Sequence, residues 1–205
     1  MTALLQQTAF VLWGSPVTWV ELLGDASGAA CVWLVARQSL WNWPVGLLNN
    51  GLFFVLFLGS RLYGDAVLQL VFGALALYGW WSWSGARRVD LPLRVTRTPR
   101  AEWLVLAPLA ALALGGAAYV LARHTDSPVP LWDAGVLVGS LAATYGQARK
   151  RLESWWLWIA VDVVSVPLYV SRKLYPTAAL YVLFAGLCVM GLREWTRALP
   201  RPSPR

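Results

Sequence analysis

Two tryptophans and an aspartate lie on one side of a strongly apolar segment in the last third of the chain. Trp155, Trp158 and Asp162 are spaced i, i+3 and i+7, which puts two indoles and a carboxylate on one face of a helix. Indole rings stack on planar heterocycles, and a positive charge on the heterocycle adds a cation–π attraction. A carboxylate accepts hydrogen bonds from ligand hydroxyls. This face therefore predicts a binding site for a planar ligand with polar edges.

A related face occurs in the first third of the chain. Trp43, Gly46 and Asn50 have the same spacing. When Trp43 is aligned with Trp155, the constant shift brings twelve identities into register between Arg37 and Trp83 without a gap. The Trp, Tyr, Phe, Gly and Arg identities are harder to attribute to chance than the Leu identities. The chain therefore contains an internal repeat, and the two faces are placed to line one site on a pseudo-twofold axis.

The composition indicates that the elements carrying these faces lie in a membrane. Only 13% of the 205 residues are charged, 58% are hydrophobic and the mean hydropathy is +0.54. A water-soluble fold of this composition would expose too much apolar surface, since soluble domains carry about twice this share of charged residues. The run from Leu104 to Ala118 lacks the alternation that a transmembrane β-barrel requires. We expect an all-α integral membrane protein.

A helix needs about 20 apolar residues to cross a bilayer, and seven segments provide them. These are Val17 to Ala36, Trp43 to Ser60, Leu62 to Trp83, Trp103 to Ala122, Leu131 to Gln147, Trp155 to Ser171 and Tyr175 to Leu192. Three helices and one linker helix precede the second triple, so both triples enter the membrane from the same side, as a parallel 3+1+3 repeat. The predicted parts are an extracytoplasmic segment (1–16), a first repeat (17–83), a basic cytoplasmic loop (84–102), a linker helix (103–122), a second repeat (131–195) and a cytoplasmic tail (196–205).

The basic residues are distributed unevenly between the two sides of this topology. Thirteen of the 17 Lys and Arg residues fall on one side and four on the other, and cytoplasmic loops are enriched in basic residues. This places the N-terminus outside and the C-terminus in the cytoplasm. The net charge of +7 then belongs to membrane-flanking loops, and we expect no nucleic-acid binding. Residues 1–16 carry no charge, unlike a signal peptide. A short interfacial helix is expected there, from Leu4, Leu5, Phe10, Val11 and Trp13.

Uncharged polar side chains within the predicted spans are further candidates for the site. Gln69, Thr144 and Gln147 lie at or near membrane depth. Such groups either join helices by hydrogen bonds or contact a ligand. Tyr78 lies nine positions after Gln69 and does not share its face; it completes the set of candidate substrate-binding residues.

Few other residues point to chemistry. Glu21 and Asp25 share a face near the outer start of the first span, where they are either hydrated at the interface or turned toward the bundle. His124 is the single histidine, so a multi-histidine metal site is excluded. Cys31 and Cys188 lie inside spans and are expected to serve packing. The sequence has no P-loop motif. We therefore expect no catalytic residue, metal or cofactor.

Several linked motifs resemble those of the PnuC family of bacterial vitamin transporters, over about residues 17–195. They occur in the same order and at matching spacing. The motifs are Trp41-Asn42-Trp43-Pro44-x-Gly46, Leu62-Tyr63-x-Asp65 through Gln69 to Tyr78-Gly79-Trp80, Glu153-Ser154-Trp155-x-x-Trp158-Ile159-x-x-Asp162, and Leu168-Tyr169 through Leu174-Tyr175-x-Thr177-Ala178-x-Leu180-Tyr181 to Gly191 and Trp195.

The resemblance implies facilitated diffusion of nicotinamide riboside across the bacterial inner membrane, by a 3+1+3 fold similar to that of SWEET sugar transporters. It also implies that a cytoplasmic kinase traps the nucleoside by phosphorylation, that homotrimers form, and that Trp155 and Trp158 form a substrate-binding W-x-x-W motif. Other members of the family carry thiamine or riboflavin, and the motifs leave these alternatives open. Two further alternatives are open as well. One is proton coupling through Asp162 or Glu21, and the other is a role as a membrane receptor or assembly subunit.

Overall fold

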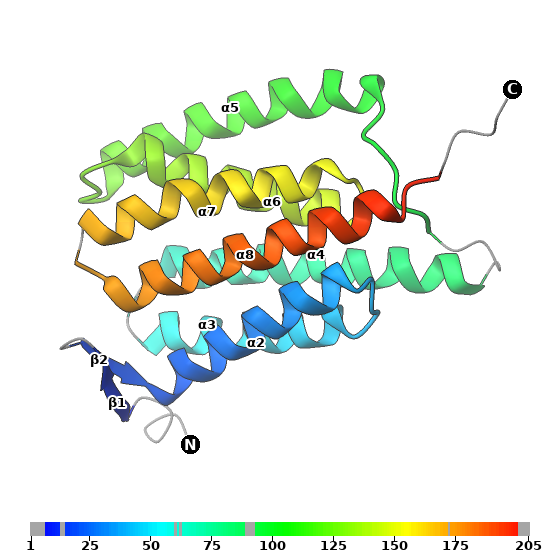
Figure 1. The fold of residues 1–205 in the computed structure, drawn as a ribbon. Coiled ribbons are helices and arrows are strands. Elements are labelled where there is room, and N and C mark those ends of the chain that lie inside the picture. The colour runs from blue at the N-terminus through cyan, green and yellow to red at the C-terminus, as the bar shows by residue number, and fades with distance from the viewer. Residues whose placement is uncertain are drawn as a thin grey trace, which may run out of the picture.

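The computed structural model describes residues 7–12, 15–59, 61, 63–88, 93–171 and 173–200, and within them the chain forms seven helices (Figure 1). The helices are α2 (Trp19–Ala36), α3 (Asn42–Gly59), α4 (Tyr63–Arg88), α5 (Arg100–His124), α6 (Pro130–Ala148), α7 (Glu153–Ser171) and α8 (Tyr175–Arg197). All except α6 are long and apolar enough to cross a membrane. The small and polar residues of α6 lower its hydropathy. The predicted all-α membrane fold is confirmed.

The prediction of a helix within residues 1–16 is wrong for the part that the structure describes. Strand β1 (Thr8–Leu12) pairs antiparallel with β2 (Ser15–Thr18); Leu4, Leu5 and Trp13 lie outside the described residues. Phe10 and Val11 have high strand propensity. The first membrane helix begins at Trp19 because Thr18 and Glu21 form a capping box, in which the Glu21 carboxylate accepts from the Thr18 backbone N–H at 2.8 Å.

The other helix boundaries differ from the predicted ones mainly at their charged ends. α4 continues to Arg88 and α8 to Arg197, because arginine is a good helix former and does not end a helix. The predicted linker is longer than expected and spans Arg100–His124 as α5. The loop between α4 and α5 is correspondingly shorter than the predicted range of 84–102.

Successive helices pack against one another within two groups. α2 contacts α3, and α3 contacts α4; in the second group α6 contacts α7, and α7 contacts α8. The groups meet where α2 packs against α8 and α4 against α6. α5 contacts α6 at the edge of the bundle (Figure 1), and none of its residues is buried. The interface between the two groups is therefore where polar side chains from both repeats can meet.

Two pairs of tryptophans have nearly the same geometry in the two groups. The rings of Trp43 and Trp83 are 5.3 Å apart and perpendicular, and those of Trp155 and Trp195 are 5.4 Å apart at 89°. The members of the first pair are the repeat equivalents of the members of the second, so the repeat found in the sequence has a three-dimensional counterpart. Edge-to-face contacts of this kind stabilise aromatic pairs beyond their buried area.

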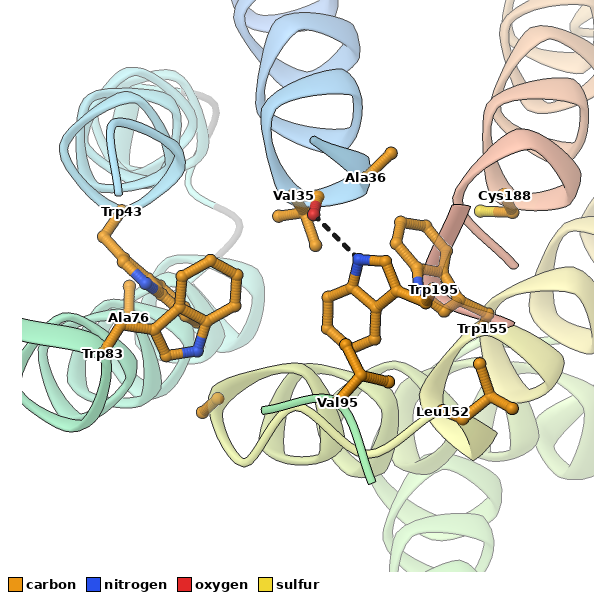
Figure 2. Close-up of a cluster of buried hydrophobic side chains, with 11 residues drawn as sticks. Val35, Ala36, Trp43, Ala76, Trp83, Val95, Leu152, Trp155, Cys188 and Trp195 are labelled. Carbon is orange, nitrogen blue, oxygen red and sulfur yellow. Dashed lines mark hydrogen bonds between the residues drawn. The ribbon is translucent and has the colours of Figure 1, made fainter. Parts of the chain in front are cut away.

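Each pair also donates one hydrogen bond to the other group of helices. Trp83 Nε1 donates to the backbone carbonyl of Gln147 at 3.2 Å, and Trp195 Nε1 donates to that of Val35 at 3.1 Å (Figure 2). Val35 and Gln147 are themselves equivalent positions of the repeat, so the two bonds are exchanged between the repeats. Through these hydrogen bonds, the tryptophan pairs link the two groups of helices at one end of the bundle.

The segment before α5 covers this tryptophan cluster. Val95 is buried in the cluster (Figure 2), and Thr96 exchanges backbone hydrogen bonds with the α6–α7 turn, donating to Lys150 at 3.1 Å and accepting from Leu152 at 2.9 Å. The side chain of Arg151 donates to Glu102 at 2.6 Å. These contacts hold the loop against the second group of helices.

We expect Arg151→Ala to lower the apparent melting temperature of the detergent-solubilised protein, through a loss of about 1–3 kcal/mol in the free energy of unfolding. The ion pair with Glu102 is largely buried, with side-chain exposures of 14% and 15%. Arg197→Ala is the matched control, because its 3.8 Å pair with Glu194 is exposed and such pairs contribute at most about 1 kcal/mol. Equal shifts for the two variants would contradict this assignment.

Candidate ligand-binding cavity

A cavity of about 630 Å³ lies between the two groups of helices. It is lined by side chains from α2, α3, α4, α6, α7 and α8, with no lining residue from α5. Val17 and Pro176 border it near the hairpin, and Asn42 and Gln147 border it at the opposite end. A mostly apolar cavity of this size with a few polar groups is typical of small-molecule sites.

The structure brings seven of the nine candidate site residues together in this cavity. They come from four helices and from both repeats. They are Trp43, Asn50, Gln69, Thr144, Gln147, Trp158 and Asp162. The fold thus brings together residues that are far apart in the sequence. Their function as ligand contacts remains a prediction.

Trp155 does not line the cavity, so only Trp158 of the two predicted stacking residues faces it. Its side chain is fully buried, with 0% exposure, and lies directly on Gly191 of α8 and against the ring of Trp195. Residues three apart point about 60° away from each other around a helix. At Trp158 this difference turns the indole into the cavity, and at Trp155 it turns the ring into the space that Gly191 leaves.

Tyr78 also lies outside the cavity lining. Its ring stacks on Tyr145 of α6, with centroids 6.3 Å apart and planes 4° from parallel. Its hydroxyl accepts from the guanidinium of Arg149 at 3.4 Å, and this hydrogen bond raises the pKa of Arg149. Tyr78 therefore joins α4 to the end of α6 in this structure.

Two polar groups of the cavity lining have free hydrogen-bonding capacity. Asp162 is 2% exposed and hydrogen-bonds the Cys188 thiol, while its Oδ2 has no partner among the described residues. The indole Nε1 of Trp158 likewise lacks an acceptor among them. Leaving such groups unpaired in a protein interior costs free energy. A ligand with hydroxyl or amide groups would pair them.

The charge of the lining has one sign in the described part of the chain. Glu21, Asp25 and Asp162 line the cavity, and none of the described lining residues is Lys, Arg or His. Both Glu21 and Asp25 are half-buried at the cavity, and the Glu21 carboxylate there accepts from Thr18 in the capping box. An acidic cavity attracts cations and opposes phosphate groups.

The sequence reasoning missed Asn49, which lines the cavity and joins two of its walls. Its Nδ2 donates to the Gly24 carbonyl at 2.6 Å and to the Ser27 hydroxyl at 3.0 Å. Adjacent asparagines at positions 49 and 50 in an otherwise apolar helix are the signal that identifies it, because each uncompensated amide in a membrane helix requires a partner.

Known proteins resemble this chain along most of its length. The model of the nicotinamide mononucleotide transporter family matches residues 18–197. The riboflavin/roseoflavin transporter RibM of Streptomyces davaonensis is 34% identical over 93% of this chain and 91% of its own. The nicotinamide riboside transporter PnuC of Escherichia coli is 28% identical over 89% and 87%.

The fold also matches a solved structure. The crystal structure of the vitamin B3 transporter PnuC superposes with a TM-score of 0.70 at 21% sequence identity, covering 88% of this chain and 81% of that one. This match shows that the two proteins share a fold. The chain therefore belongs to the nicotinamide mononucleotide transporter family, as a multi-pass membrane transporter and not an enzyme.

Proposed function

We propose that the chain carries nicotinamide riboside across the bacterial inner membrane by facilitated diffusion. The observation that carries this proposal is the cavity, in which Trp158 lies beside the buried carboxylate of Asp162. The substrate joins a flat cationic pyridinium to a ribose. Stacking and cation–π attraction from the indole suit the ring, and the carboxylate suits the positive charge and the hydroxyls. The nicotinamide riboside transporter of Escherichia coli is a relative at 28% identity.

The proposed mechanism is rocking of two triples, α2–α4 and α6–α8, around the cavity, with α5 as the linker of a parallel 3+1+3 arrangement. The cavity extends to Val17 and Pro176 near the hairpin. The tryptophan pairs lie at its opposite end. With the N-terminus outside, the hairpin end is the proposed outer end and the tryptophan pairs are the proposed inner closure. Inward opening then requires the exchanged hydrogen bonds of Trp83 and Trp195 to break.

Retention of the substrate is proposed to depend on phosphorylation by a cytoplasmic kinase. A phosphate adds negative charge, and the described lining offers carboxylates without a basic side chain. The phosphorylated product would therefore bind the cavity poorly. Net uptake follows from this trapping and needs no energy coupling in the transporter itself.

Riboflavin is the second candidate substrate, favoured by the 34% identity to RibM. Its ring system is also flat and polar-edged but carries no positive charge, so the acidic lining can pair only with its hydroxyl groups and gains no charge attraction. Charge dependence thus separates the two candidates.

The experiment is calorimetric titration of the purified protein with nicotinamide riboside, riboflavin and thiamine in separate runs. We expect nicotinamide riboside to bind, and Asp162→Asn to weaken that binding about 10- to 100-fold, the loss typical of a charged hydrogen bond. Asp126→Asn, at an exposed loop position, is the matched control. Binding of riboflavin alone would assign the second candidate, and unchanged binding by Asp162→Asn would exclude this carboxylate from the site.

A further inference from the structure

Asn42 is a buried amide at the closed end of the cavity. It lines the cavity and is 1% exposed, and neither its Nδ2 nor its Oδ1 has a partner among the described residues. It is the first residue of α3, one position after the N-cap. Here only its backbone is engaged, with its N–H donating to Ser39 at 3.3 Å. A buried amide without partners destabilises a protein unless a ligand pairs with it.

The equivalent position in the second repeat has no such capacity. Ser154 is also 1% exposed, but its hydroxyl donates to the Arg151 carbonyl at 2.7 Å and it does not line the cavity. The repeats are therefore asymmetric at this level, and only the first presents a polar group to the cavity. The symmetry of the repeat therefore does not explain why an unpaired amide is buried at Asn42.

The positions of the lining residues along the helix axes place Asn42 beside one edge of a ligand ring stacked on Trp158. Trp158 corresponds in the repeat to Gly46, one turn or about 6 Å along α3 from Asn42. Asn50 and Asp162 lie about 6 Å further on, and all five residues line the cavity. A heterocycle stacked on Trp158 would thus have one edge toward Asn42 and the other toward Asn50 and Asp162.

We propose that Asn42 determines ligand specificity by hydrogen-bonding to an adjacent donor and acceptor on the edge of the planar ligand. One amide offers an N–H donor and a carbonyl acceptor side by side, which matches the carboxamide of nicotinamide or the imide edge of a flavin. The sugar hydroxyls are left to Asn50 and Asp162. This inference rests on the proposed function and assigns the ring end of the ligand to the closed end of the cavity.

The test compares two ligands that differ only at this edge. Nicotinamide riboside and its analogue with a methyl ketone in place of the carboxamide are titrated into the protein and into Asn42→Leu. We expect the unmodified protein to prefer the carboxamide about 10- to 100-fold and Asn42→Leu to bind both ligands equally. If riboflavin is the ligand that binds, the pair becomes riboflavin and riboflavin methylated at the imide nitrogen. Ser154→Ala, the repeat-related control, keeps the preference.

A second measurement separates binding from folding. Leucine has about the shape of asparagine without polar atoms, so Asn42→Leu should raise the melting temperature of the ligand-free protein, because it removes the unpaired amide. A preference that survives in Asn42→Leu, or equal weakening of both ligands with a lower melting temperature, would overturn the role of Asn42 alone. Absence of binding by every vitamin in the unmodified protein would overturn the proposed function and this inference together.

Discussion

Trp158→Ala is expected to weaken nicotinamide riboside binding about 100-fold. Trp158 is the only residue of the W-x-x-W motif whose indole lines the cavity. Stacking of a base on an aromatic side chain contributes about 1–3 kcal/mol, and a cationic ring adds a cation–π term. Calorimetric titration measures the loss, and uptake by the variant should fall with it.

Trp156→Ala is the matched control for this prediction. Trp156 lies on the same helix but is 59% exposed, on the side away from the cavity. Its removal should leave the affinity unchanged. If Trp158→Ala bound the substrate as tightly as the unmodified protein, or if both variants lost binding equally, the cavity would not be the binding site.

Gly191→Ala is expected to destabilise the fold by about 1–3 kcal/mol or more, the range measured when extra atoms are forced into a packed interior. A Cβ at this position would overlap the six-membered ring of Trp155. Trp155 is fully buried and held by the perpendicular ring of Trp195, so it cannot move aside without breaking the pair. The apparent melting temperature in detergent should fall clearly.

The control for this substitution lies on the same helix. Gly186→Ala meets no atom within 4 Å, and alanine favours a helix over glycine, so its melting temperature should stay the same or rise. In the first repeat, Gly79→Ala should behave like Gly191→Ala, because Trp43 covers Gly79 in the same way. Tolerance of both substitutions would contradict the packing described for the indoles.

The helices could be predicted from the sequence because their apolar runs are bounded by charges and, in all but α6, are long and apolar enough to cross a bilayer. The hairpin could not, since a short apolar run such as Thr8–Leu12 fits a strand as well as a helix. The repeat predicted that Trp43 and Trp155 are equivalent. It did not predict that their contacts close one end of the bundle through hydrogen bonds exchanged between the groups.

The sequence predicted most of the candidate residues that line the cavity, but not which side chain of each helix faces it. Helical spacing puts Trp155 and Trp158 on one face but does not resolve which of them reaches the cavity. That choice depends on Gly191, which lies on the following helix, and on the space that it leaves for the Trp155 ring. Asn42 was part of a recognised motif, yet its unpaired amide is visible only once its neighbours are placed.

The central claim is that this cavity carries a vitamin across the membrane without energy coupling. Uptake of radiolabelled nicotinamide riboside by proteoliposomes, in the absence of ATP and with a proton ionophore present, tests it most directly. We predict equilibration down the substrate gradient that the ionophore leaves unchanged and that Trp158→Ala abolishes. Uptake that needs a proton gradient, or no uptake of nicotinamide riboside, riboflavin or thiamine, would contradict the claim.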